Sequence, residues 1–265
     1  MARIFFGPVP VDNVIMTTAI DLAVTWLRGD RGHFIATVNP EMVVAAQHDP
    51  AFLTALQRAD LALADGMGLW LASRLLGQPL AERVPGVDFI IQLISRAETH
   101  GASVYLLGGA AGVAELAKQT LQQLFPRLLI VGAESGGVLR PEQWNEAVTA
   151  DVAAAAPSIV LVAFGHGKQE RWIVDHLSQL PSVRIAIGVG GTLNFLAGTA
   201  KRAPKIFRGL GLEWLWRVFR PNRDAYLDPW RFKRIWRATC VFSWLVVQWK
   251  WHSLWQRRIG PLMHH

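Results

Sequence analysis

The sequence predicts an α/β fold, a Rossmann-like parallel sheet with flanking helices, followed by a basic, Trp-rich, helical C-terminal appendage. Short apolar runs alternate with helical stretches through the first 200 residues. Apolar strands separated by helices indicate a parallel sheet covered on both faces, with right-handed βαβ connections. The composition changes near Gly198, where basic residues and tryptophan become frequent. We therefore expect a body at residues 1–198 and an appendage at 199–265.

The first hundred residues show short β-rich runs between longer stretches with helical periodicity. We expect strands at Ile4–Phe6, His33–Val38 and Leu61–Ala64, and helices at Thr17–Arg28, Glu41–Arg58 and Gly68–Leu76.

A clearer alternation follows in the second hundred residues. Glycine ends the first of these strands, proline stops the first helix, and a proline in the first turn marks the next helix. The expected strands are Ser103–Leu107, Leu129–Val131, Ile159–Phe164 and Arg184–Gly188, and the helices are Val113–Leu124, Pro141–Ala155 and Lys168–Leu180.

Positive charge and tryptophan are concentrated in the tail. Residues 1–200 hold 13 Lys+Arg and 17 Asp+Glu, a net charge of −4, whereas residues 201–265 hold 14 and 3, a net of +11. Eight of the 12 tryptophans also lie in the tail. Indole rings favour the headgroup level of a bilayer, where cations meet anionic phosphates. The tail therefore indicates an anionic membrane surface as a partner, with nucleic acid as the competing polyanion.

No segment has the length of a membrane-spanning helix. The charge-free run Ala238–Trp249 has 12 residues, whereas a spanning helix needs about 20. An interfacial or re-entrant segment and a buried core helix are both compatible with it. The N-terminus does not resemble a signal peptide, because Pro8, Pro10 and Asp12 interrupt it. The lone Cys240 excludes an intramolecular disulfide framework.

Polar residues gather where the predicted strands end. Ligands of parallel α/β sheets bind beyond these carboxyl ends, and six ends facing one rim would form a polar crevice. The segments are 37–40, 65–68, 108–109, 132–137, 165–170 and 188–194. Gly108 and Gly109 open a candidate phosphate-binding turn before a helix. They lack the full GxGxxG pattern, and a tight strand-to-helix turn is the alternative.

Asp65 is the candidate for acid–base chemistry. It follows the apolar run Leu61–Ala64 and precedes Gly66, and a carboxylate at a strand tip is well placed as a general base. Position alone favours the alternative, an N-cap for the following helix. Thr37 and Asn39 end the preceding strand and either face the same crevice or serve as turn residues.

Metal and nucleophile motifs are missing from the sequence. There is no His-x-x-x-His, no Asp-x-Asp pair, no P-loop and no GxSxG elbow. An Asp-x-Asp pair commonly holds a divalent metal against the diphosphate of a nucleotide sugar. We therefore expect no metal, and any phosphate would be neutralised by Arg, Lys and backbone amides.

Seven segments resemble the WecG/TagA/CpsF family of bacterial glycosyltransferases, in the expected order and over about residues 1–225. They are TVNPEMVVAA (37–46), ADGMG (64–68), ERVPGVDF (82–89), FGHGKQERW (164–172), GVGGTLNFLAG (188–198), KRAPKIFRGLGLEWLWR (201–217) and RPNR (220–223). Each segment alone is unspecific, whereas the ordered set is highly specific.

The resemblance implies a metal-independent, inverting transferase without a cofactor. The family moves a sugar from a nucleotide diphosphate donor, usually UDP, to a polyprenyl-diphosphate-linked sugar at the cytoplasmic face of the bacterial inner membrane. Its products are precursors of teichoic acid, common antigen and capsule or exopolysaccharide. N-acetylmannosamine is the expected donor sugar, with UDP-glucose or a UDP-uronic acid as alternatives. A peripheral membrane location and a homo-oligomer are also expected.

The resemblance also implies roles for the residues of the body. Asp65 matches the general base, which reverses the preference for an N-cap. Thr37 and Asn39 match a polar pair in the donor pocket, and Arg83 matches a clamp on the diphosphate or sugar. Gln169 would contact the nucleotide or sugar.

The remaining matches are a structural residue and residues that would lie close to the nucleotide or substrate. Glu170 would be structural only. Gly190 and Gly191 would let the backbone approach the nucleotide, Asn194 would bind substrate, and Gly108 and Gly109 would lie near the nucleotide.

In the tail, Arg217 and Arg223 match arginines that bind the lipid diphosphate and replace a metal in stabilising the leaving group. Arg220 fits either that role or a lipid-headgroup contact. The chain departs from the family at His166-Gly167, where Ser-Pro is usual, at Asn194, where Asp is usual, and in the spacing from Arg217 to Arg223, which is one residue shorter. The donor contacts and the diphosphate site therefore stay open.

Two other classes remain as alternatives. An NAD-dependent dehydrogenase is disfavoured by the incomplete glycine motif and by the lack of a convincing catalytic His or Lys/Tyr pair. A non-enzymatic scaffold that binds lipid or nucleic acid through its tail would not depend on the Asp65 carboxylate.

Overall fold

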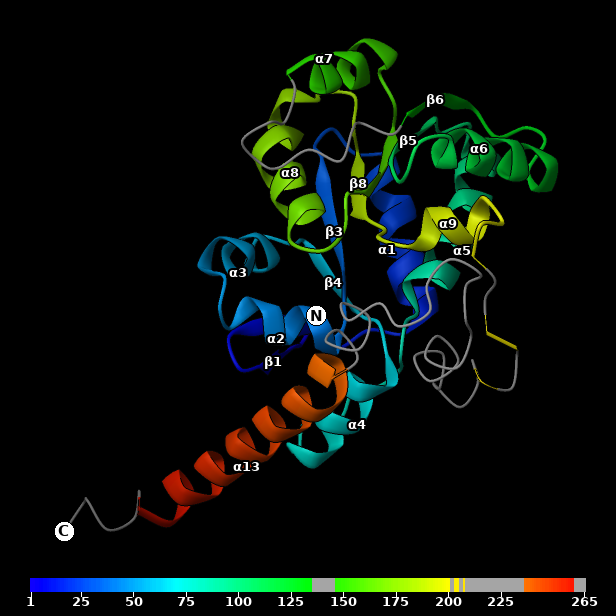
Figure 1. Cartoon of the computed structure of the whole chain (residues 1–265). Coiled ribbons are helices and arrows are strands. Elements are labelled where there is room, and N and C mark those ends of the chain that lie inside the picture. Colours follow the sequence, from blue (N-terminus) through cyan, green and yellow to red (C-terminus); the bar gives the residue numbers. More distant parts are fainter. Residues whose placement is uncertain (135–145, 201–202, 205–206, 208–235, 260–265) are drawn as a thin grey trace.

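The computed structural model describes residues 1–134, 146–200, 203–204, 207 and 236–259. Its centre is a six-stranded sheet in the order β4-β3-β8-β7-β5-β6 (Figure 1). All its strand pairs are parallel, so the predicted α/β class is confirmed. The strands are β3 (His33–Val38), β4 (Leu61–Ala64), β5 (Val104–Gly108), β6 (Ile130–Glu134), β7 (Ile159–Ala163) and β8 (Ile185–Gly188).

Both faces of this sheet are buried, because successive side chains of each apolar strand enter opposite cores. On β7, Ile159 and Leu161 belong to one core, whereas Val160 and Val162 belong to the other. The first core lies under α1 (Met16–Leu27), α5 (Gly86–His100), α6 (Val113–Leu124) and α9 (Thr192–Leu196). The second lies under α2 (Pro40–Ala46), α3 (Pro50–Gln57), α4 (Met67–Leu75), α7 (Glu146–Ala155) and α8 (Lys168–His176).

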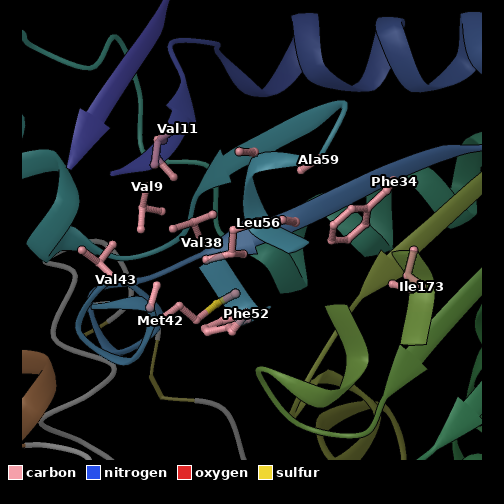
Figure 2. Packing of buried hydrophobic residues seen from close by; sticks show 14 of the residues in the cluster. Val9, Val11, Phe34, Val38, Met42, Val43, Phe52, Leu56, Ala59 and Ile173 are labelled. Atoms are coloured by element: carbon pink, nitrogen blue, oxygen red, sulfur yellow. The ribbon is translucent and has the colours of Figure 1, made fainter. Parts of the chain in front are cut away.

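The first predicted strand forms a separate hairpin. β1 (Arg3–Phe6) pairs antiparallel with β2 (Val9–Asp12), outside the parallel sheet. β2 was not predicted because it contains Pro10, which an edge strand tolerates. Asp12 ties the hairpin to β4, since its carboxylate accepts a 2.8 Å hydrogen bond from the Ala62 N–H. Figure 2 shows Val9 and Val11 of β2 in the same core as Phe52 and Leu56 of α3.

Several predicted helices differ from the observed ones. The expected helix Glu41–Arg58 is two helices, because Asp49 caps α3 and Pro50 begins it. Helix α8 ends at His176, and a 3₁₀ turn, η2 (Leu177–Gln179), follows. Helices α5 and α9 were not predicted. The expected strand Leu129–Val131 corresponds to β6, which begins one residue later and ends three residues later, at Glu134. Residues 141–145 of the expected helix Pro141–Ala155 lie outside the described residues.

The C-terminal helix packs on the body with one side only. A π-helical turn, η3 (Arg237–Val241), leads into α13 (Phe242–Ile259), which Figure 1 shows running outward beside α2 and α4. Phe242 and Val246 are each 3% exposed and belong to the second core. Trp249 fills the space over Gly7 in the hairpin turn, where an added Cβ would lie 2.6 Å from its ring.

The opposite side of α13 carries large exposed apolar residues, with Trp244 59%, Val247 63% and Trp251 69% exposed. The run 238–249 is therefore part core and part exposed surface. No helix in the described part of the chain is long and apolar enough to span a membrane. The division at residues 198 and 199 stays a prediction.

A matched pair of substitutions tests the docking of α13. We expect Phe242→Ala to lower the free energy of unfolding by about 3–5 kcal/mol, because it empties a buried position. Trp244→Ala removes a larger but exposed ring and should stay within about 0.5 kcal/mol of the parent. Urea unfolding followed by tryptophan fluorescence would measure both. Equal effects of the two substitutions would contradict this packing.

Candidate active site

One cavity of about 460 Å³ lies beyond the carboxyl ends of five of the six parallel strands. From the middle of the sheet, the order of β3 and β4 leads to one edge and the order of β5 and β6 leads to the other. In open parallel sheets, ligands bind at the point where the strand order changes direction in this way. The described residues lining it are Thr37, Asn39, Met42, Asp65, Val87, Gly109, Ala110, 163–166, Lys168, Gln169, 189–192, Asn194 and Phe195.

Asp65 reaches this cavity directly after β4. Its backbone N–H donates to the carbonyl of Val38 at 2.7 Å, which holds the ends of β3 and β4 together. The N-cap residue of α4 is Gly66, not Asp65. The N-cap interpretation of Asp65, which position alone favoured, is therefore wrong.

Gly86 packs against both Asp65 and Thr37. A Cβ at Gly86 would lie 2.9 Å from Thr37 Cγ2 and 3.2 Å from Asp65 Oδ2, so only glycine fits without displacing them. Gly86 is also the first residue of the 15-residue helix α5. The partial positive charge of a helix N-terminus stabilises a carboxylate beside it.

Thr37 and Asn39 lie at the end of β3, as the sequence predicted. The Thr37 hydroxyl donates to the Gly188 carbonyl at 3.0 Å and so links the ends of β3 and β8. Asn39 caps α2, because its Oδ1 accepts from the Met42 N–H at 3.0 Å. Both residues line the cavity, so each combines a structural bond with a position at the pocket wall.

Arg83 is not among the residues that line the cavity. It is half-buried in the segment between α4 and α5, next to Val84, whose N–H donates to the Ala64 carbonyl at 3.0 Å. Arg83 therefore directly precedes the residue that is bonded to the end of β4. Its clamp role stays a prediction.

Gln169 is 2% exposed and its amide is engaged within the protein. Its Nε2 donates to Glu170 Oε1 at 2.8 Å, and its Oε1 accepts from the Gly190 N–H at 3.1 Å. Glu170 is fully buried, and its Oε2 accepts from the Gly167 N–H at 2.6 Å. Burial raises the pKa of the Glu170 carboxyl to about 7, against the opposing effects of its hydrogen bonds and of Arg171.

The glycines after β5 have a packing role. An added Cβ at Gly108 would lie 2.8 Å from the Ala163 backbone, so this glycine permits the close approach of β5 and β7. The Gly109 N–H donates to the Ala163 carbonyl at 3.1 Å. Gly109 lines the cavity and Gly108 does not, and the Gly109 amide expected to be open to phosphate is used in this turn.

Of the predicted sixth strand end, 132–137, the described residues 132–134 do not line the cavity. Residues 132–134 belong to β6 at the sheet edge, and 135–137 lie outside the described residues. Gly132 pairs beside Tyr105, whose ring occupies the space that a Cβ would need. The glycine therefore serves strand packing.

The loop after β8 supplies Gly190, Gly191 and Asn194 to the cavity. Gly190 has φ +48, and a Cβ added at either glycine would meet no atom within 4 Å, so there is room for a ligand beside both residues. The Asn194 carbonyl accepts from the Ala200 N–H at 3.0 Å and the Thr199 hydroxyl at 3.1 Å. These bonds fold the chain back after α9.

Positive charge at the cavity comes from the start of α8. Lys168 and His166 both line it, and His166 Nε2 lies 3.8 Å from Glu41 Oε1. Asp65 is the one carboxylate among the described lining residues. Within the described residues, no three His, Cys, Asp or Glu side chains are grouped to hold a metal ion. Arg217, Arg220 and Arg223 lie outside the described residues.

Sequence reasoning missed three features of this site. Gly86 was quoted only within ERVPGVDF, and the proline before it was a signal for the start of α5. Lys168 was assigned to a helix without a site role. Glu170 was considered structural only, because sequence does not show that a carboxylate is buried.

The comparisons with known proteins point to one family. The model described as "Glycosyl transferase WecG/TagA/CpsF family" matches residues 4–256. The N-acetylglucosaminyldiphosphoundecaprenol N-acetyl-beta-D-mannosaminyltransferases of Staphylococcus aureus strains MRSA252 and NCTC 8325 / PS 47 are each 36% identical to the chain over 219 residues. The match covers 82% of this chain and 84% of each relative.

Two glycine substitutions test the packing around Asp65. We expect Gly86→Ala to lower the free energy of unfolding by about 1–3 kcal/mol, because its methyl group would displace Thr37 or the Asp65 carboxylate. Gly191→Ala is the control, since Gly191 is exposed at φ −73 with open space around it, and it should stay within about 0.5 kcal/mol of the parent. Thermal unfolding would measure both variants. A Gly86→Ala variant as stable as Gly191→Ala would contradict this packing.

Proposed function

The chain belongs to the WecG/TagA/CpsF family of glycosyl transferases, and we propose that it transfers N-acetylmannosamine from UDP to a polyprenyl-diphosphate-linked N-acetylglucosamine. The S. aureus relatives carry the name of this reaction. The observation in the structure that supports it best is Asp65, the one carboxylate among the described residues of a polar pocket at the strand ends. UDP-glucose and a UDP-uronic acid are the alternative donors.

Inversion at the anomeric carbon needs one base opposite the leaving group. In the proposed reaction Asp65 takes the proton from the acceptor hydroxyl as its oxygen bonds to the anomeric carbon. The bond from that carbon to the diphosphate oxygen breaks, and UDP leaves with the electron pair. The N-terminus of α5 beside Asp65 supports the carboxylate form that this step needs.

The leaving diphosphate of UDP needs positive charge or N–H donors, and we propose that side chains supply them without a metal. Lys168 and His166 lie at the cavity wall at the start of α8, where the helix N-terminus also favours an anion. The proposed arginines of the tail, Arg217, Arg220 and Arg223, would bind the diphosphate of the lipid-linked acceptor and add positive charge next to the leaving group.

The proposed location is the cytoplasmic face of the inner membrane, with the protein bound peripherally. The tail carries a net charge of +11 over residues 201–265. Trp244, Val247 and Trp251 expose an apolar side of α13 next to basic sequence. Apolar area and cations together favour binding to an anionic bilayer.

Donor turnover tests the reaction and the base. We expect UDP release and one glycosylated product from UDP-N-acetylmannosamine and polyprenyl-diphosphate-N-acetylglucosamine, with no loss in EDTA. Asp65→Asn should lower kcat by about 10²–10⁴-fold, because it removes the base. Asp175→Asn, which neutralises an exposed carboxylate on α8, is the matched control and should keep full turnover.

Four outcomes would contradict parts of this proposal. Full turnover in Asp65→Asn would exclude the base role, and loss of turnover in EDTA would exclude metal independence. A product only from UDP-glucose or a UDP-uronic acid would change the donor. No product from any donor, with Asp65→Asn still binding membranes, would favour a scaffold.

Vesicle binding tests the apolar side of α13. We expect the double substitution Trp244→Ser and Trp251→Ser to weaken binding to phosphatidylglycerol vesicles at least about ten-fold, because two indole rings no longer enter the interface. Leu124→Ser removes a residue that is 61% exposed on α6 and serves as the control. Equal binding of the double variant and the control in a co-sedimentation assay would exclude this surface.

A further inference from the structure

We propose that Glu170 is a positioning residue that holds the glycine loop after β8 in the shape required to bind the donor nucleotide. This inference rests on the proposed function, because it assumes that a UDP-sugar occupies the cavity. Glu170 is not among the residues that line the cavity, whereas its neighbour Gln169 is. Its effect on the donor would therefore pass through Gln169.

A chain of three hydrogen bonds joins two walls of the cavity. The Gly167 N–H donates to Glu170 Oε2 at 2.6 Å, and Gln169 Nε2 donates to Glu170 Oε1 at 2.8 Å. Because its nitrogen is held in this way, Gln169 presents Oε1 to the Gly190 N–H at 3.1 Å. The carboxylate thus fixes the orientation of the amide that holds Gly190.

Close packing at Gly188 supports the same arrangement. A Cβ at Gly188 would lie 2.7 Å from Gln169 Nε2 and 2.9 Å from Glu170 Oε1. The carbonyl of Gly188 also accepts the hydrogen bond from Thr37. The end of β8 therefore lies directly against the Glu170–Gln169 pair, and Gly190 and Gly191 of the cavity wall follow it in the chain.

Both carboxylate oxygens of Glu170 accept hydrogen bonds, so the ionised form fits this site. Protonation would turn one oxygen into a donor facing an N–H group, and one bond would be lost. Because burial raises the pKa of Glu170 to about 7, this change falls within the pH range of ordinary assays.

The segment around Glu170 carries other charged groups, and Arg171 acts directly on the Glu170 carboxylate. Arg171 donates from Nε to the Gly167 carbonyl at 2.7 Å and from Nη2 to Oδ2 of Asp49, the N-cap of α3, at 3.2 Å. His166 lies 3.8 Å from Glu41 of α2, and Lys168 and Asp65 line the cavity. The pH test therefore compares variants at Glu170 with the parent, in which these other groups are unchanged.

The experiment measures UDP binding by calorimetry at pH 8 and pH 6 for the full chain, Glu170→Gln and Glu115→Gln. At pH 8 we expect Glu170→Gln to bind UDP about five-fold more weakly than the parent, since one hydrogen bond of the chain is lost. At pH 6 the parent carries a protonated Glu170, so the ratio of the UDP dissociation constants of Glu170→Gln and the parent should fall towards one. Glu115→Gln, at an exposed position on α6, should match the parent at both pH values.

Titration of UDP itself affects all variants equally and cancels in the ratio. A ratio that is one at pH 8, or that does not change between pH 8 and pH 6, would overturn the proposal.

Stability separates positioning from a purely structural role. The folded-state pKa of Glu170 lies above the ordinary value of 4.5, so its contribution to stability decreases as the pH rises from about 4.5 to 7. We expect Glu170→Gln to reduce this pH dependence of Tm and to melt no lower than the parent at pH 8. Weaker UDP binding in a variant of equal or higher Tm supports positioning, whereas a matching loss of Tm would indicate a structural role.

A third readout does not require UDP. Hydrogen exchange of the Gly190 amide should be faster in Glu170→Gln than in the parent at pH 8, because Gln169 no longer holds it. If the parent does not bind UDP, the proposed function fails, and faster exchange would still support the role of Glu170. Unchanged exchange at Gly190 would overturn that role.

Discussion

The burial of both faces of the parallel sheet determines where chemistry can occur in this protein. The strands send apolar side chains into two cores, so polar groups on the sheet must lie beyond the strand ends. The hydroxyl of Thr37 and the backbone of Asp65 join β3 to its two neighbours at that edge. The pocket is thus formed by the same bonds that align the strands. This explains why Thr37 is buried and Asp65 is half-buried although both face a cavity.

Sequence patterns predicted the parallel sheet because each strand is a short apolar run between helices. They failed where local signals compete. The run from Glu41 to Arg58 has helical composition throughout, and only the Asp49-Pro50 pair marks the break that the structure shows. Val9-Pro10-Val11 does not have the sequence pattern of a strand, and only its pairing with Ile4–Phe6 in the structure identifies it as one. Helix α9 has five residues, which is too short for a periodic pattern to be recognised.

The candidate site shows a similar division between what sequence reveals and what it hides. Motif order placed Asp65, Thr37 and Asn39 at one pocket, and the structure brings them together there. Their partners depend on contacts between segments that are distant in the sequence, such as Gly86 against Asp65 or Gln169 against Gly190. Glu170 shows the limit most clearly, because its importance comes from complete burial and from two N–H donors. Neither complete burial nor hydrogen bonding to these donors can be recognised from a sequence pattern.

Helix α2 contacts both the pocket and the C-terminal helix. Its cap, Asn39, lines the cavity, and its body packs against η3 and α13. Phe242 and Trp249 fix α13 to the hairpin, so this helix of 18 residues starts from a fixed point on the body; its rise is about 27 Å. In the proposed membrane-bound state, the exposed side of this arm would rest on the bilayer, and the fixed joint between α13 and the body would set the height of Asp65 above the lipid. An acceptor tethered to that bilayer would then have to present its hydroxyl at the same height.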